Sequence, residues 1–216
     1  TTAGRTYSYQ KKIITKILEN YCTIIKRHCN LNKTIEVVIA VWTPHKKKRM
    51  TFYSYNKKEG RDPHAIRPYN MGVIGELQKL ETEGSDNDFD FVGIYDSKDE
   101  TNFKYLHIDS NTLDTTNLTL TNKTIEEQHW SGPNSTTKAM LAITLKNIKH
   151  QFFGALTFDF SENIEDSNIT ELIKLSINCR DSIKNILATS ISTEYPIYLK
   201  LLETSELKEG NKNESF

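Results

Sequence analysis

Residues 138–160 show the clearest alternation of apolar and polar positions in the chain. Strand side chains point alternately to opposite faces, so Leu141, Ile143 and Leu145 lie on one face and Ala142 on the other. After a short polar turn at residues 147–150, the next strand alternates between two sets: Phe152, Leu156, Phe158 and Phe160, and Phe153, Ala155, Thr157 and Asp159. The segment therefore predicts a β-hairpin in the middle of a sheet, with one large apolar face.

The second face of this hairpin carries small residues at its centre, Ala142 and Ala155, and a third alanine, Ala40, lies in the middle of an earlier strand. Small residues in the middle of a sheet mean either that another segment packs tightly there or that space is left for a ligand. The sequence leaves both alternatives open. We expect the three alanines to point to a common side of the sheet, away from the terminal helices.

Helical periodicity predicts one helix near each end of the chain. Apolar residues recur at spacings of three and four over residues 9–29 and again over residues 168–188. The apolar stripe of the first helix is wide, which indicates contact on two sides, for example with the sheet and with a partner helix. A shorter helix is predicted at residues 71–81, and strands are predicted at residues 34–44, 50–56, 89–95 and 103–108.

The pattern predicts one domain, residues 1–190, followed by a C-terminal extension, residues 191–216. Within the extension we expect a short helix at residues 197–208 and disorder from residue 210 onward. Residues 102–137 show little regular patterning, and a stretch of that length inside a compact domain is often functional or mobile.

Composition narrows the function classes. The 28 Lys and Arg residues balance the 28 Asp and Glu residues, which argues against an obligatory nucleic-acid partner. No apolar run approaches the roughly 18 residues of a membrane span. Three cysteines, an odd number, suit a reducing compartment, so we expect a cytoplasmic protein. Cys22 and Cys29 lie about 10 Å apart along the predicted helix, too far for a disulfide.

Motifs of catalysis and metal binding are missing from the sequence. It has no P-loop, no G-x-G-x-x-G after a strand, no G-x-S-x-G, no H-E-x-x-H and no paired C-x-x-C. The carboxylates are scattered, and no pair can be assigned acid and base roles. We therefore predict no catalytic residue and no metal site, name no cofactor, and favour a non-catalytic domain over an enzyme.

Three segments resemble the GAF domain, the sensor fold of phosphodiesterases, phytochromes and many bacterial regulators. Residues 71–77 (MGVIGEL) resemble the family's glycine-bearing segment before its short helix. Residues 139–145 (AMLAITL) resemble the strand written S-x-L-A-V-P-L, and residues 153–158 (FGALTF) resemble the x-G-V-L-x-L strand that follows it. The order of predicted elements over roughly residues 10–190 is also similar to that of the family.

The resemblance implies an α+β fold with a central antiparallel β-sheet. The N- and C-terminal helices would pack on one face, and residues 102–137 would cover a ligand pocket on the other. The residues that we expect at this ligand-binding face are Ala40, Trp42, Tyr53, Ala142, Ala155 and Thr157, with Trp130 above them.

The chain also departs from the family in ways that limit the ligand. The N-K-F-D-E signature of cyclic-nucleotide-binding members is absent, and no cysteine lies in residues 102–137 for bilin attachment or for free methionine sulfoxide reduction. The first hypothesis is a small-molecule-sensing or regulatory domain that signals through helix pairing in a homodimer. The alternative is a ligand-free dimerisation or protein-interaction module.

Overall fold

A computed structural model of the chain describes residues 2–29, 31, 37–45, 48–55, 66–68, 72–83, 89–99, 102–109, 119–124, 137–146 and 152–187. Three helices and a short 3-10 turn lie among eight strands in these ranges. In chain order the elements are α1 (Thr2–His28), β1 (Val37–His45), β2 (Lys48–Tyr55), β3 (Ile66–Pro68), α2 (Gly72–Glu83), β4 (Phe89–Asp96), η1 (Ser97–Asp99), β5 (Asn102–Asp109), β6 (Thr121–Thr124), β7 (Ala139–Lys146), β8 (Phe152–Phe160) and a helix at residues 166–187.

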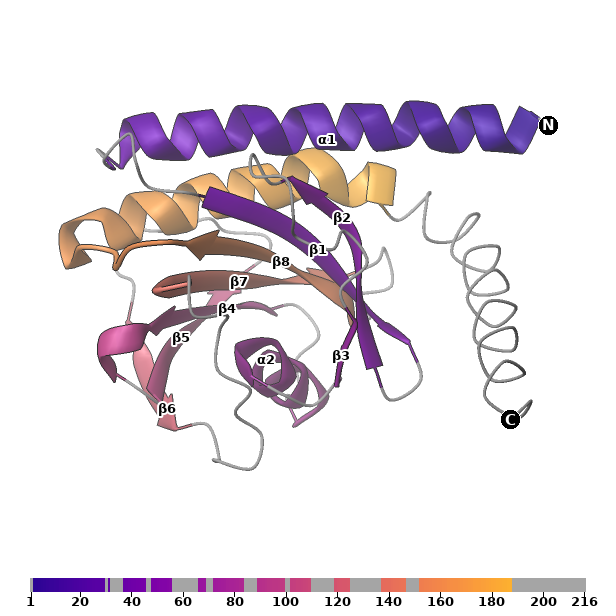
Figure 1. The fold of residues 1–216 in the computed structure, drawn as a ribbon. Helices are drawn as coiled ribbons and strands as arrows, with labels where there is room; N and C mark the ends of the chain where they lie inside the picture. Colours follow the sequence, from indigo (N-terminus) through magenta and orange to yellow (C-terminus); the bar gives the residue numbers. More distant parts are fainter. Residues whose placement is uncertain are drawn as a thin grey trace, which may run out of the picture.

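The strands form one sheet, ordered β3-β2-β1-β8-β7-β4-β5-β6 among the described residues, and every neighbouring pair is antiparallel. Figure 1 shows α1 and the helix of residues 166–187 above the sheet and α2 on the opposite side. This arrangement confirms the predicted α+β class, the antiparallel sheet and the placement of both terminal helices on one face. The N-terminal end of α1 reaches beyond the end of the helix of residues 166–187.

The larger hydrophobic cluster lies between the sheet and the two terminal helices. It joins Ile14 and Leu18 of α1 to Leu141, Ile143 and Phe158 of the central strands, all of them 0% exposed. Residues 166–187 contribute a long buried stripe: Ile169, Leu172, Ile173, Leu175, Ile177, Cys179, Ile183 and Leu187. Burial of this apolar surface is the main favourable term that holds the helices to the sheet.

A smaller cluster lies on the opposite face, under α2. It contains Val73 and Leu77 of α2 together with Ala142 and Ala155 of the central strands, and Trp42 packs against it. The helix begins at Gly72, whose φ of +66° lies in the left-handed region that glycine adopts without the penalty of a Cβ atom. The predicted glycine-bearing entry to this helix is confirmed.

The central hairpin has the predicted pairing with one change. Leu141 pairs with Phe158 and Ile143 with Leu156, but the register shifts next to Leu145. Because of this shift, Phe152 pairs with Lys146 instead of continuing the face of Leu156. Phe153 packs against the larger cluster in its place. The expected parity of these two phenylalanines was therefore wrong, since a bulge exchanges the faces of the residues beyond it.

Two short strands were not predicted. β3 pairs with β2, and β6 pairs with β5 inside the stretch that was expected to have little regular structure. The remaining expectation for that stretch, a cover over the second face that includes Trp130, lies outside the described residues, as do residues 188–216 and the predicted extension. No helix in the described part of the chain is long and apolar enough to cross a membrane.

Candidate functional site

A row of small residues crosses the second face of the sheet. Gly93 of β4 pairs with Ala142 of β7, Ala142 pairs with Thr157 of β8, and Thr157 pairs with Ala40 of β1. Ala142 and Thr157 are fully buried. Antiparallel partners lie side by side on one face of a sheet, so the row runs without a break across four strands.

Helix α2 closes directly over one end of this row. A Cβ atom added to Gly93 would lie 2.8 Å from Cγ1 of Val73 and 3.2 Å from Cδ2 of Leu77. Real Cβ atoms do not approach carbon atoms as closely as the first of these distances, so glycine is what allows α2 to lie against β4. At Gly93, therefore, the missing Cβ atom makes room for helix α2.

Trp42 lies at the other end of the face. It pairs with Ala155 in the β1–β8 register, and its indole Nε1 donates a hydrogen bond to Oγ1 of Thr157 at 3.0 Å. The indole is half-buried, whereas Ala155 and Thr157 are fully buried. A molecule that approached this face would therefore meet the edge of Trp42 before the alanine.

For Ala40 and Tyr53, two further predicted site residues, the structure describes the backbone but not the side chain. The backbone of Ala40 pairs with Thr157, within the row, but its side chain lies outside the described part. The backbone of Tyr53 pairs with Val41, one position out of phase with Ala40 and Trp42, and its side chain is also outside the described part. Three of the seven predicted residues, Trp42, Ala142 and Ala155, therefore belong to one cluster, and Thr157 contacts it through Trp42. Ligand binding by these residues stays a prediction.

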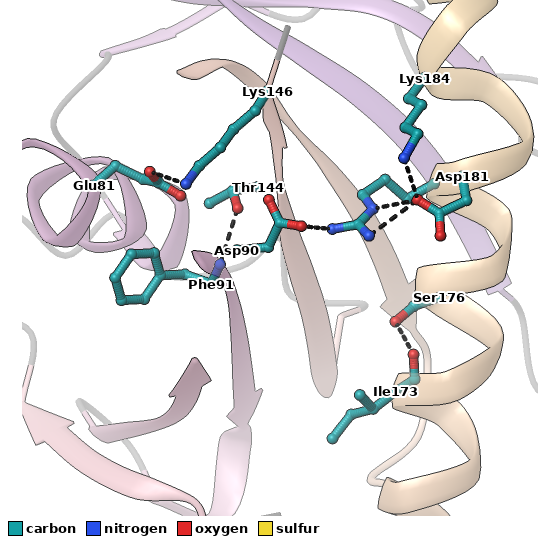
Figure 2. Close-up of polar contacts among 10 residues, drawn as sticks. Glu81, Asp90, Phe91, Thr144, Lys146, Ile173, Ser176, Asp181 and Lys184 are labelled. Atoms are coloured by element: carbon teal, nitrogen blue, oxygen red, sulfur yellow. Dashed lines mark hydrogen bonds and ion pairs between the residues drawn. The ribbon is translucent and has the colours of Figure 1, made fainter. Parts of the chain in front are cut away.

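A buried ion pair connects β4 to the helix of residues 166–187. The guanidinium of Arg180 contacts a carboxylate oxygen of Asp90, and the two side chains are 5% and 8% exposed. Nε and Nη2 of Arg180 both lie 3.0 Å from Oδ1 of Asp181, and Nζ of Lys184 lies 3.2 Å from the same oxygen. Figure 2 shows this chain of charges running from Asp90 to Lys184, whose side chain is 46% exposed.

A second buried pair lies on the opposite face and connects α2 to β7. Nζ of Lys146 lies 2.9 Å from Oε2 of Glu81, and both side chains are 7% exposed. Burial raises the pKa of Glu81 above its ordinary value, and nearby Asp90 adds to the rise, while Lys146 and the Thr144 hydroxyl offset part of it. Oγ1 of Thr144 also accepts a hydrogen bond from the backbone N–H of Phe91 at 3.0 Å.

Sequence reasoning missed both ion pairs. The sequence signal that could have predicted one of them is a charged residue inside an apolar segment. Asp90 interrupts the strand FDFVGIY, and Arg180 follows Cys179 within the buried stripe of the last helix. Charged side chains are almost never fully buried unless they are paired. That rule predicts partners for both residues but does not identify them.

The thiols and carboxylates offer no visible reaction centre in the described part. Burial raises the pKa of Cys22 to about 12 and that of Cys29 to about 11, and it also raises the pKa of Cys179. The thiolate is the nucleophile, so these cysteines are unreactive at neutral pH. Over the described ranges, no group of three or more His, Cys, Asp and Glu residues could hold a metal ion.

An open groove of about 270 Å³ lies on the face of the terminal helices. Lys104 and Leu120 line one side, and Asp166, Ile169 and Thr170 from the start of the last helix line the other. Its lining shares no residue with the predicted ligand-binding face.

The chain is similar in structure to several solved GAF domains. The phycoerythrobilin-bound GAF domain of a cyanobacterial phytochrome matches with a TM-score of 0.50 at 10% identity, over 86% of this chain and 92% of that chain. The phycocyanobilin-bound GAF domain of a cyanobacterial phytochrome gives 0.48 at 10% identity, over 87% and 96%. The GAF domain of an Acinetobacter phosphoenolpyruvate-protein phosphotransferase gives 0.48 at 8% identity, over 87% and 96%.

No protein-family model matches the sequence, and no curated protein matches it. At about 10% identity, the likeness to the first of these domains establishes the fold and nothing about the ligand.

Proposed function

Since this chain has a GAF-like fold, we propose that it is a non-catalytic regulatory domain that senses a small molecule on the α2 face of its sheet. The observation that carries the proposal is the row of small residues from Gly93 to Ala40, which ends beside a half-buried tryptophan. The row spans four strands; α2 lies against it at Gly93, and Val73 and Leu77 of α2 share one buried cluster with Ala142 and Ala155. Ligand pockets are typically apolar, with a few polar groups that fix orientation.

The output would pass to the terminal helices on the opposite face. Glu81 ties α2 to β7, β7 pairs with β4, and Asp90 ties β4 to the helix of residues 166–187. A ligand that displaces α2 would therefore act on strands that are directly bonded to this helix. Such a ligand shifts the population of helix arrangements by its difference in affinity for them.

We further propose that the domain forms a homodimer through its terminal helices. Ile17, Tyr21 and Ile24 form a half-buried apolar stripe on α1 next to its fully buried stripe. Ile186 of the last helix is also half-buried, and Oη of Tyr21 lies 3.0 Å from Oγ of Ser182. Half-buried apolar residues and a pair of hydroxyl groups therefore lie where α1 meets the last helix, and protein interfaces contain such a mixture of apolar and polar groups.

The ligand proposal is tested by measuring the melting temperature of the protein with a panel of metabolites. Two matched variants locate the effect, Ala155→Val on the α2 face and Ala139→Val under the terminal helices. Both alanines are 0% exposed, so both variants add the same two methyl groups at a buried position, one on each face of the sheet. We expect Ala155→Val to reduce the ligand-induced rise and Ala139→Val to retain it. Equal retention in both variants, or no metabolite that raises the melting temperature, contradicts the proposal.

The dimer is tested separately by sedimentation of Ile17→Glu and Ile24→Glu. Both positions are half-buried in the described chain, so a charge there should disrupt a dimer more than it disrupts the fold. A parent protein that sediments as a monomer contradicts this part of the proposal and leaves ligand binding untouched.

A second candidate is a ligand-free dimerisation or protein-interaction module. The observation in its favour is the complete burial of Ala142, Ala155 and Thr157, with α2 already in van der Waals contact at Gly93. It predicts a stable dimer whose melting temperature no small molecule changes.

A further inference from the structure

The positive charge of this neutral chain is concentrated in α1. The helix contains six Lys and Arg residues and one acidic residue, Glu19, so its formal charge is +5. The whole chain has 28 Lys and Arg residues and 28 Asp and Glu residues. The rest of the chain therefore has 22 basic and 27 acidic residues and a formal charge of −5. The protein is neutral as a whole but strongly asymmetric, with its excess of positive charge on one helix.

Three of these basic side chains share the solvent-facing side of α1. Exposed residues recur there at spacings of three and four and form what we call the basic stripe: Lys12, Lys16, Asn20, Thr23 and Arg27. The buried stripe on the opposite side of the helix has the same periodicity: Ile14, Leu18, Cys22 and Ile25. The half-buried Ile17, Tyr21 and Ile24 lie between the two, so the basic stripe and the proposed dimer surface are different sides of α1.

The two ends of the basic stripe keep their positive charge uncompensated. In its middle, Nζ of Lys16 lies 2.7 Å from Oε2 of Glu19, the one acidic residue of the helix. Lys12 and Arg27 are exposed, and neither has an acidic partner among the described residues. The stripe therefore presents a positive potential to an outside partner.

The basic stripe is straight and lies on the outside of the molecule. A helix rises about 1.5 Å per residue, so Lys12 and Arg27 are about 22 Å apart along its axis. Figure 1 shows α1 as a straight helix along the outer side of the domain. The sheet and the helix of residues 166–187 lie on its inner side, and no described element lies beyond it. A flat surface can therefore contact the whole stripe at once.

From this arrangement we propose that the basic stripe of α1 docks the domain on an anionic lipid surface, such as a bilayer that contains phosphatidylserine. Each Lys or Arg held near such a surface strengthens binding about fivefold. The stripe has no apolar member, so the contact is electrostatic and no side chain of the stripe enters the acyl region. The negative charge of the rest of the chain orients the molecule with α1 toward the lipid.

Two features favour a lipid surface over a nucleic acid. Two of the three cations in the stripe are lysines, which act as point charges and lack the bidentate contacts that arginine makes with phosphates. The phosphates of a duplex wind around its axis, so a straight row of cations meets few of them, whereas lipid headgroups cover a plane. The excess acidic residues of the remaining chain also repel a polyanion that extends beyond α1.

The test is co-sedimentation of the full chain with vesicles of phosphatidylcholine alone and of phosphatidylcholine with about 30% phosphatidylserine. We expect binding to the anionic vesicles only. This binding should disappear as the salt concentration rises from about 0.1 M to about 1 M, because the Debye length falls from about 10 Å to about 3 Å. Absence of binding to the anionic vesicles, or equal binding to both kinds, overturns the proposal.

Matched charge reversals assign the binding to the basic stripe. Lys12→Glu and Lys98→Glu each replace an exposed lysine and change the net charge equally, but Lys98 lies in η1, between β4 and β5. Lys12→Glu should weaken binding to anionic vesicles about 25-fold, since each of its two units of charge contributes about fivefold. Arg27→Gln should weaken it about fivefold, and Lys98→Glu should bind as the parent does. Circular dichroism establishes that all three variants remain folded.

The remaining outcomes separate the stripe from other causes and other partners. If Lys98→Glu weakens vesicle binding as much as Lys12→Glu does, net charge and not the stripe is responsible, and the assignment is wrong. If a short DNA duplex or polyglutamate binds the parent more tightly than the anionic vesicles do, the stripe serves a nucleic acid or an acidic protein, and the lipid proposal fails. Each of these results leaves ligand sensing standing, because that function is tested on the opposite face of the sheet by melting temperature.

Discussion

Removal of Arg180 should destabilise the fold far more than removal of its neighbour Lys184. In Arg180→Met the carboxylate of Asp90, 8% exposed, loses its guanidinium partner and remains buried. Breaking a buried pair from one side is destabilising by about 3–5 kcal/mol, because the charge left behind is uncompensated. For a chain of about this length, each kcal/mol lowers Tm by roughly 2–4 °C, so we expect a fall of roughly 6–20 °C.

Replacing both partners should restore most of this loss. In the double variant Asp90→Val with Arg180→Met no charge is left unpaired, and such replacements are often neutral or stabilising. We therefore expect the double variant to lie within about 1 kcal/mol of the parent. The coupling energy in a double-mutant cycle is then at least about 2 kcal/mol, and it is larger by whatever Asp90→Val costs alone. The assay is urea unfolding followed by circular dichroism, with the m-value compared among all variants.

The control is Lys184→Met, which removes an ion pair whose side chains are 46% and 34% exposed. Exposed pairs contribute about 0–1 kcal/mol, so this variant should stay within about 0.5 kcal/mol of the parent. A coupling energy below about 1 kcal/mol, or a loss in Lys184→Met as large as that in Arg180→Met, would refute the argument that burial sets the magnitude.

Three further predictions follow from contacts elsewhere in the chain. Gly93→Ala should lower the free energy of unfolding by about 1–3 kcal/mol in urea titrations, and Val73→Ala in the same chain should recover part of it, because the new Cβ meets Cγ1 of Val73 at 2.8 Å. Burial raises the pKa of all three cysteines, Cys22, Cys29 and Cys179, so the folded protein should not react with iodoacetamide at pH 8. The urea-unfolded protein should be alkylated at all three thiols, and mass spectrometry measures both results. The raised pKa of Glu81 means that its carboxyl group binds a proton more tightly in the native state than in the unfolded state. The parent should therefore lose stability, relative to the double variant Glu81→Gln with Lys146→Met, as the pH rises above about 4.5. An increase in relative stability over that pH range would contradict the direction of the shift.

The sequence predicted the elements that bury one whole face and missed those that do not. Leu141 and Ile143 alternate with small residues in the buried middle of their strand, so the hydrophobic pattern alone set their face correctly. β6 has the sequence TNKT, three of whose four residues are exposed, and it is a strand because it pairs with β5. No local pattern could have indicated it. The bulge beside Phe153 was missed for a similar reason, since it is a property of two paired strands.

The sequence likewise predicted some residues of the candidate site and missed others. Trp42, Ala142 and Ala155 were identified because small and aromatic residues share one parity along their strands. Asp90 and Arg180 are 90 positions apart in the chain, and only the packing of a helix on a particular strand makes them partners. The pair of Glu81 and Lys146 depends in turn on where α2 crosses β7. Composition shows that such charges exist, but it cannot show which of them meet.

The two ion pairs lie at the same end of the sheet and on opposite faces of it (Figure 2). Their separation is small enough for the charge of Asp90 to raise the pKa of Glu81 through the sheet. Because a buried ion pair adds little net stability compared with apolar residues of similar size, stability alone does not account for two of them. What a buried pair does provide is a large penalty for partial separation, so a shift of α2 relative to β7, or of the last helix relative to β4, is strongly resisted. Each pair therefore fixes one helix to its own strand, and the direct pairing of β4 with β7 makes the two helices respond to the same displacement.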